Sequence, residues 1–355
     1  MSFEQEILIK LLSVALGNDG IRLLPKRIEW NKIVELAYMQ EVPALTFDGY
    51  QCIHKHLGEN ALSQKELLEW IGQTYRQEVL NKQQTKASKE LATLFDEKGL
   101  LTFVLKGMSI AQYYPNPNHR FSCDFDCFLV KDGMSAQEEG NKLVEDRYIE
   151  VDRSYYKNST FVFEGLHVEN HRFCCSIKRG KRTAELEKYL ESLFCNYNPE
   201  YFNGTKLALP PLMFQAIFLI EHACGHFLYE KMSLKNICDW ACFRKANIDH
   251  LDWEVFNKVS EEYGLQAFVN TMNHLADYIL GNYGYSSLSW IDKRVLDDIF
   301  DVRSHSGGIH VQRLSKAIGV LKSNWKFKYF SLDSMIKELC HSVYANLFDK
   351  IPSLD

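Results

Sequence analysis

The period of the hydrophobic pattern changes near position 100, and this change constrains the fold more than any other feature of the chain. Before it, residues 3–16 and 28–40 space their apolar side chains by three and four, which predicts amphipathic helices. Residues 63–98 predict one long, mostly polar helix. After the change, apolar residues run together or alternate, as they do in strands. The chain therefore predicts an α+β fold in which helices flank a small sheet.

Local signals support the N-terminal part of this prediction. Ser63 and Glu66 have the spacing of a capping box, and Gly99 is typical of the end of a helix. Pro43 is expected to interrupt the helical pattern that precedes it, because proline lacks a backbone N–H donor.

The strand-like part covers residues 100–175. Its expected elements are strands at 100–105 and 125–130, a helix at 135–147, and strands at 148–153, 160–165 and 166–173, with a turn and a short helix at 106–114. Helical patterns return at 210–231, 233–246, 250–282 and 312–349. This order predicts a mixed-sheet core at 96–205, between an N-terminal helical region at 1–95 and a C-terminal helical region at 206–355.

Composition excludes some classes of function. Hydrophobic residues make up 46% of the 355 residues, enough for a large core, and the net charge is −5. Because no global positive field is present, we do not expect bulk nucleic acid as a partner, and a small molecule is favoured. The ten cysteines form no CxxC pair, so a zinc module is not expected. No uninterrupted apolar run reaches ~18 residues, so we expect no membrane span and a cytoplasmic location.

Two aspartates lie one residue apart where the chain turns strongly apolar. In a strand, alternation places Asp124 and Asp126 on one face and Phe125 and Cys127 on the other. Paired carboxylates at this spacing can hold Mg²⁺ or Mn²⁺, which prefer oxygen ligands and share them with substrate phosphates. Alone, Asp-x-Asp is common and is also typical of a solvated strand end.

A third acid strengthens the metal interpretation. Alternation in the strand 166–173 puts His167, Glu169 and His171 on one face. If this strand pairs beside the aspartate strand, Glu169 joins Asp124 and Asp126, and His171 lies near a bound substrate.

Upstream of the aspartates, the chain has the features of a phosphate-binding turn. A buried strand leads through Lys106 and Gly107 into a predicted helix start, and Ser109 adds a hydroxyl. Glycine allows close approach of the backbone to a ligand, and the amides of a helix start bind anions. Arg120 could clamp a phosphate or pair with an aspartate.

Two pairs with helical spacing occur in the C-terminal region. His222 and His226 lie four apart, without the glutamate of a zinc-protease motif between them, so a structural or substrate-contacting role is favoured over zinc. Lys235 and Asp239 are also four apart. They form either a helical ion pair or, in the alternative, a site in which Lys235 faces a triphosphate.

Taken in order, these residues resemble the DNA polymerase β-like nucleotidyltransferase superfamily. The closer resemblance is to a bacterial nucleotidyltransferase family whose members are described as uncharacterised. The matching residues are Lys106-Gly107, Arg120, Asp124, Asp126, Glu169 with His171, His222, His226, and Lys235 with Asp239. Two departures are Met108, which separates Gly107 from Ser109, and Lys235, which stands where we expect arginine.

The resemblance implies transfer of a nucleoside monophosphate from a nucleoside triphosphate to an acceptor hydroxyl, with release of pyrophosphate. It implies two Mg²⁺ or Mn²⁺ ions on Asp124, Asp126 and Glu169. The acceptor would be a small molecule, a protein or an RNA. Two alternatives stay open: a nucleotide-binding or partner-binding protein that keeps the fold without turnover, and a helical partner-binding protein in which the aspartates are structural. Residues 63–98 are expected to be scaffold or an oligomer surface.

Overall fold

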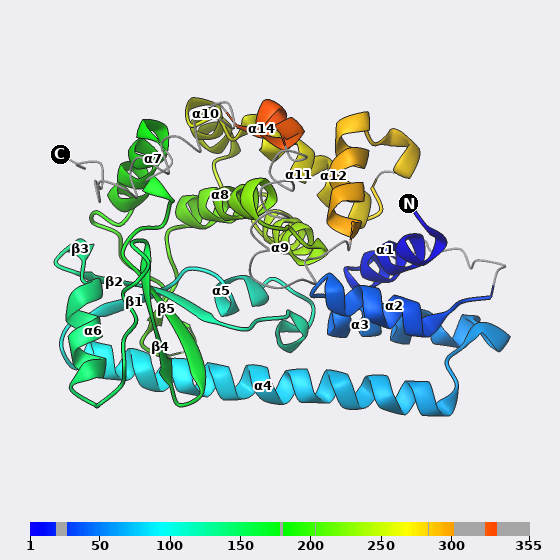
Figure 1. Cartoon of the computed structure of the whole chain (residues 1–355), viewed down its shortest axis with the longest axis horizontal. Coiled ribbons are helices and arrows are strands. Elements are labelled where there is room, and N and C mark those ends of the chain that lie inside the picture. Colours follow the sequence, from blue (N-terminus) through cyan, green and yellow to red (C-terminus); the bar gives the residue numbers. More distant parts are fainter. Residues whose placement is uncertain (19–26, 178–179, 203, 283, 302–323, 332–355) are drawn as a thin grey trace, which may run out of the picture.

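The computed structural model describes residues 1–18, 27–177, 180–202, 204–282, 284–301 and 324–331 (Figure 1). A long helix, α4 (Gln64–Asp96), runs along one side of the molecule. The sheet lies over one end of α4, the N-terminal helices lie over the other, and the C-terminal helices lie on the far side of both. The predicted α+β class is confirmed.

In the described residues before α4, the helices are α1 (Phe3–Ala15), α2 (Trp30–Met39) and α3 (Pro43–Ile53). The helical pattern is interrupted before Pro43, as predicted, because α2 ends at Met39. Pro43 then opens α3 at its first position, where the fixed φ suits a helix and the missing N–H costs nothing. At Gly49, an added Cβ would lie 2.0 Å from the carbonyl oxygen of Leu11, so only glycine lets α3 pack this closely on α1.

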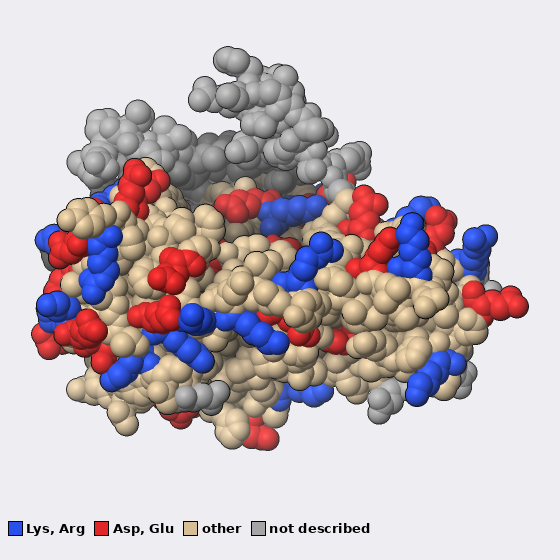
Figure 2. All heavy atoms as spheres, turned by 90° about the horizontal axis from the view of Figure 1, so that it is seen from below, with Lys and Arg blue, Asp and Glu red and all other residues tan. Residues whose placement is uncertain are grey.

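The capping box predicted for α4 is confirmed. The N–H of Ser63 donates to the Glu66 carboxylate at 2.9 Å, and the Ser63 hydroxyl accepts from the N–H of Glu66. At 1.5 Å per residue its 33 residues span about 50 Å. On the face of the molecule that α4 crosses, basic and acidic side chains are interspersed (Figure 2).

Six strands form one mixed sheet. The strands are β1 (Leu101–Val104), β2 (Phe125–Lys131), β3 (Met134–Ser135), β4 (Asn158–Phe163), β5 (Leu166–His171) and β6 (Leu207–Ala208). The order is β4-β5-β2-β1-β6, and β3 pairs with β2. β2 runs parallel to β5 and antiparallel to β1. The strand predicted at 148–153 is wrong, because that segment makes only one bridge, between Asp152 and Thr160.

Three helices accompany the sheet: α5 (Met108–Ala111), α6 (Gln137–Glu145) and α7 (Lys181–Ser192). Short 3-10 helices occur at His54–His56, Gly58–Asn60, Pro117–His119 and Tyr285–Ser287. The C-terminal region contains α8 (Leu212–Tyr229), α9 (Leu234–Ala246), α10 (Trp253–Glu262), α11 (Gln266–Ile279), α12 (Trp290–Phe300) and α14 (Asn324–Phe330). Most of the helix predicted at 312–349 lies outside the described residues.

Among the helices in the described ranges, α8 alone is apolar and long enough to cross a membrane by length and composition. A core helix passes the same test, and 56% of the α8 window is buried inside the protein. The expectation of no membrane span stays a prediction.

The hydrophobic core joins all parts of the chain. Its largest cluster takes Leu8 from α1, Phe103 from β1 and Phe214 from α8. A second cluster packs Leu91 and Phe95 of α4 under the sheet. The boundaries predicted near 95 and 205 therefore cross a continuous core, and the division into three domains stays a prediction.

Candidate functional site

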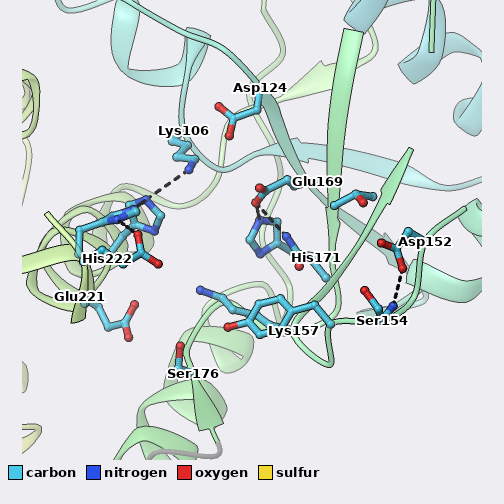
Figure 3. Close-up of a pocket in the computed structure, with 16 residues that line it drawn as sticks. Lys106, Asp124, Asp152, Ser154, Lys157, Glu169, His171, Ser176, Glu221 and His222 are labelled. Atoms are coloured by element: carbon cyan, nitrogen blue, oxygen red, sulfur yellow. Dashed lines mark hydrogen bonds and ion pairs between the residues drawn. The ribbon is translucent and has the colours of Figure 1, made fainter. Parts of the chain in front are cut away.

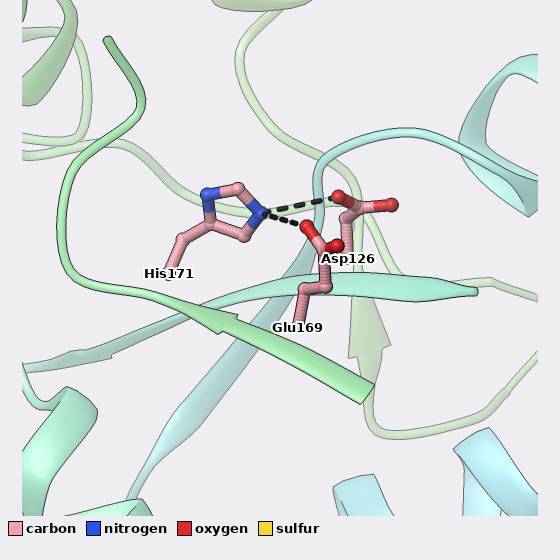
Figure 4. A group of neighbouring side chains, drawn as sticks. All are labelled: Asp126, Glu169 and His171. Carbon is pink, nitrogen blue, oxygen red and sulfur yellow. Dashed lines mark hydrogen bonds and ion pairs between the residues drawn. The ribbon is translucent and has the colours of Figure 1, made fainter. Parts of the chain in front are cut away.

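Strand register places two acids side by side. In the parallel pair of β2 and β5, Asp126 lies opposite Glu169, and His171 follows two residues later on the same face. One ligand atom from each of these three side chains lies within 4.8 Å of the others (Figure 4). Asp126 is 1% exposed, while the Glu169 side chain is 34% exposed. The group therefore has a buried end and an accessible end.

The hydrogen bonds of His171 orient it for ligation. Its Nδ1 lies 3.3 Å from the carbonyl oxygen of Phe173, which can only accept, so Nδ1 carries a proton. Its Nε2 faces Asp126 at 3.1 Å and Glu169 at 3.5 Å. Burial alone would lower the pKa of His171, but the hydrogen bonds to Asp126 and Glu169 raise it. Nε2 therefore carries either a proton or a metal ion.

Asp126 has one carboxylate oxygen to spare. Its Oδ1 lies 3.1 Å from Nζ of Lys106 and from Nε2 of His171. Its Oδ2 is buried and has no hydrogen-bond partner among the described residues. Burial raises the pKa of Asp126, but Lys106 and His171 more than offset this and lower it. Because the carboxylate stays charged, the group of Asp126, Glu169 and His171 fits a divalent cation.

Asp124 lies just before β2 and is half-buried. It is not part of the close group of three within the described chain, although it faces the same cavity as Glu169 (Figure 3). Burial and the nearby carboxylates of Asp126 and Glu169 raise the pKa of Asp124, while Lys106 opposes the shift. The structure thus brings His171, rather than Asp124, into one close group of possible metal ligands with Asp126 and Glu169.

Lys106 connects the sheet to α8. Its Nζ lies 3.1 Å from Asp126 and 3.3 Å from Nε2 of His222. Burial would lower the pKa of Lys106, but Asp126, Asp124 and Glu169 raise it, so it is charged. Burial and the Lys106 charge lower the pKa of His222 far below its usual value, so His222 is neutral and accepts from Lys106.

The turn after Lys106 differs in part from the expected phosphate loop. Gly107 has φ 73°, in the region that favours glycine, and lines a cavity. However, α5 has only four residues, so it provides little helix dipole. Ser109 is fully buried, and its hydroxyl has no partner in the described chain and does not reach the cleft.

Arg120 is held in a buried ion pair. Its Nε donates to Oδ1 of Asp239 and its Nη2 donates to Oδ2, both at 2.7 Å. Oδ1 of Asp239 also accepts from the hydroxyl of Tyr114 at 2.6 Å. The interpretation of Lys235 and Asp239 as an ion pair is therefore wrong, since Lys235 pairs with Glu41 at 3.0 Å. A phosphate contact by Arg120 stays a prediction, as does one by Lys235.

The two histidines of α8 form a chain rather than a metal pair. Nε2 of His226 lies 2.9 Å from Nε2 of His222, and Nδ1 of His226 lies 2.7 Å from Glu230. Neither histidine belongs to the metal-capable group found in the described residues. Glu221, which directly precedes His222, lines the same cavity as both histidines.

Lys106 and Asp124 are among the residues that line a cavity of about 410 Å³ between the sheet and α8 (Figure 3). Glu169 and His171 lie on the sheet side, and His222 and His226 lie on the helix side. An adjoining cavity of about 290 Å³ shares Lys106 and Asp124 with the first and adds Gly107 and Lys235. The site is therefore a cleft between the core and the C-terminal helices.

Comparison with known protein families decides the assignment. The model of a family described as uncharacterised nucleotidyltransferase matches residues 26–281, more than half of the chain. The chain belongs to this nucleotidyltransferase family. No curated protein and no solved structure matches it. The matched region includes the sheet, the close group of three and the histidines of α8.

Sequence reasoning missed several residues of the cleft. It assigned His171 a substrate contact, although an acid two residues before a histidine on one strand face is a signal for a shared metal. It also missed Lys157, Ser176 and Glu221, which line the larger cavity. No local pattern connects them, because they come from three separate segments.

Proposed function

We propose that the protein transfers a nucleoside monophosphate from a nucleoside triphosphate to an acceptor hydroxyl. The observation that carries this proposal is the group of Asp126, Glu169 and His171 within a nucleotidyltransferase family match. The charged Lys106 beside it and Lys235 in the adjoining cavity suit a triphosphate.

In this proposal, Asp126, Glu169 and His171 hold Mg²⁺ or Mn²⁺, and Asp124 adds a ligand for a second ion at the cavity mouth. When bound, such ions neutralise phosphate charge and stabilise the attacking and leaving oxygens. Lys106 places a fixed cation beside the phosphates. His171 is kept in one orientation by the carbonyl of Phe173 at 3.3 Å.

The transfer itself is a displacement at phosphorus. The acceptor oxygen forms a bond to the α-phosphorus, and the bond from that phosphorus to the bridging oxygen breaks. Pyrophosphate leaves with the bridging oxygen and the bonding electron pair. Glu169 accepts the hydroxyl proton, a role favoured by its greater exposure compared with Asp126. Positioning and charge neutralisation supply much of the rate.

The second candidate is a nucleotide-binding protein without turnover. One observation favours it: Lys106 pairs with Asp126, and Ser109 lies away from the cleft, so the phosphate turn departs from the expected arrangement. Partners and location remain part of the proposal. The net charge of −5 favours a small acceptor over bulk nucleic acid, and the cytoplasm is the proposed compartment.

Calorimetric titration of ATP, CTP, GTP and UTP with Mg²⁺ tests the proposal. The wild type is expected to bind at least one of them in a metal-dependent way, and Asp124→Ala/Asp126→Ala is expected to lose this binding. Asp132→Asn, at an exposed turn, serves as the matched control. Absence of nucleotide binding by the wild type contradicts both candidates. Release of pyrophosphate then separates the enzyme from the binding protein.

A further inference from the structure

The larger cavity contains charged groups that the proposed transfer does not use. Lys157, Ser176 and Glu221 line it away from the metal group, and they are 8%, 6% and 7% exposed. Within the described chain, the side chains of Lys157 and Glu221 form no hydrogen bond or ion pair. Figure 3 shows all three pointing into the same space.

Rigid segments hold these side chains in place. The carbonyl oxygen of Lys157 accepts from the N–H groups of Arg172 and Phe173 at 2.8 and 3.1 Å, which fixes Lys157 beside the end of β5. Ser176 follows Cys175, whose N–H donates to the buried Glu187 carboxylate at 2.6 Å. Glu221 lies within α8, next to His222.

The charged atoms of Lys157 and Glu221 face the cavity, where water reaches them. A ligand that displaces this water would leave each charge without hydration unless it also supplied an opposite charge, and an unpaired charge in such a place is costly. Lys157 and Glu221 do not satisfy each other, since no ion pair joins them in the described structure. A ligand that brings one charge of each sign would satisfy both. A purely anionic ligand would face Glu221, and a purely cationic one would face Lys157.

We propose that Lys157, Ser176 and Glu221 form the acceptor subsite, and that the acceptor is a small hydroxyl-bearing zwitterion of the amino-acid class. Its anionic group binds Lys157, its ammonium binds Glu221, and Ser176 adds a hydrogen bond. The inference rests on the proposed function, because the acceptor's hydroxyl is the group that attacks the α-phosphorus near Glu169. The cavity of about 410 Å³ lies within the range of small-molecule sites.

Matched probes test the charge requirement directly. L-serine and L-tyrosine carry both charges. Ethanolamine and tyramine lack the carboxylate, and 3-hydroxypropanoate and 3-(4-hydroxyphenyl)propanoate lack the ammonium. Binding is measured by calorimetry without nucleotide. At least one amino acid is expected to bind about tenfold or more tightly than both of its analogues.

Two variants locate the effect. Lys157→Met is expected to remove the preference over the amine analogue, and Glu221→Gln is expected to remove the preference over the acid analogue. Such a gain in relative binding of one analogue cannot result from misfolding. Lys206→Met and Glu59→Gln serve as controls of matched charge, because Lys206 and Glu59 are exposed on the surface away from the cavity.

The inference is overturned if neither amino acid is preferred by the wild type, or if both variants keep the wild-type preference. Failure of the proposed function has a different signature. In that case the wild type binds no nucleoside triphosphate with Mg²⁺ in a separate titration, whatever the amino-acid probes show.

Discussion

The ammonium of Lys106, which lines the cleft, lies 3.1 Å from Oδ1 of the buried Asp126. Lys106 lies two residues after the end of β1 and Asp126 lies in β2, so the antiparallel pairing of these strands brings the two charges together. Without a metal ion, Lys106 and His171 are the cations that compensate the buried carboxylate. Lys106 and a divalent ion would thus compete for the same negative charge.

Lys106→Met tests this competition. We expect the variant to lose on the order of 1.5–3 kcal/mol of unfolding free energy in metal-free buffer, because Asp126 loses a charged hydrogen bond. We also expect Mn²⁺ to stabilise it more than it stabilises the wild type, since the ion no longer competes with the ammonium. Urea unfolding with and without Mn²⁺ measures both effects. Equal stabilisation of the variant, the wild type and the control Lys206→Met contradicts the competition.

Metal affinity is expected to depend on the protonation of His171. Its raised pKa means that it keeps a proton to a pH above 6.5, and this proton must leave before Nε2 can bind a metal. Mn²⁺ affinity should therefore rise with pH from 6.5 through the raised pKa and then level off. In the metal-free protein, the imidazolium contributes stability that is fully present below pH 6.5. This stability is lost as the pH rises through the raised pKa of His171.

Mn²⁺ titrations between about pH 6 and pH 9 measure this dependence. His171→Asn, which removes the titrating group, is expected to flatten the curve, whereas His56→Gln, at an exposed position, should not. A curve of unchanged steepness in His171→Asn would show that another group controls the affinity.

The buried pair of Arg120 and Asp239 is expected to be strongly coupled. Arg120→Met should cost about 3–5 kcal/mol of unfolding free energy, because it leaves Asp239 buried without its cation. The double variant Arg120→Met/Asp239→Leu should be more stable than the sum of the single changes predicts. Chemical denaturation of all four proteins gives the coupling energy. A value near zero would mean that the pair is not formed in solution.

Much of this arrangement follows from local sequence, and its limits are physical. Alternation in β2 and β5 was enough to predict that Asp126 and Glu169 share a face, and the parallel pairing then joined them. The apolar residues of 148–153 resembled a strand, but Ile149 and Val151 pack on the second hydrophobic cluster without a ladder. Arg120 and Asp239 are 119 residues apart, and only tertiary packing selects that pairing.

His119 connects two N-terminal helices in a way that depends on pH. Its Nδ1 lies 2.7 Å from Asp48 of α3, and its Nε2 lies 2.9 Å from Glu78 of α4. Burial lowers the pKa of His119, but the two carboxylates raise it by more, so the net shift is upward. The ion pairs of His119 with Asp48 and Glu78 therefore contribute stability that is fully present below pH 6.5 and is lost as the pH rises through the raised pKa.

His119→Gln is accordingly expected to cost about 1.5–3 kcal/mol of unfolding free energy near pH 6 and less near pH 9. Urea unfolding at both pH values, with His56→Gln as the control, measures the difference. An equal loss at both pH values would show that the ion pairs of His119 add nothing.

The central claim is that Asp126, Glu169 and His171 bind a divalent metal ion. Electron paramagnetic resonance of free Mn²⁺ during titration measures this directly, without requiring an acceptor. The wild type and Asp132→Asn are expected to show saturable binding, and Asp126→Asn and Glu169→Gln are expected to weaken it about tenfold or more. Equal affinity in all four proteins, or no saturable binding by the wild type, would contradict the claim.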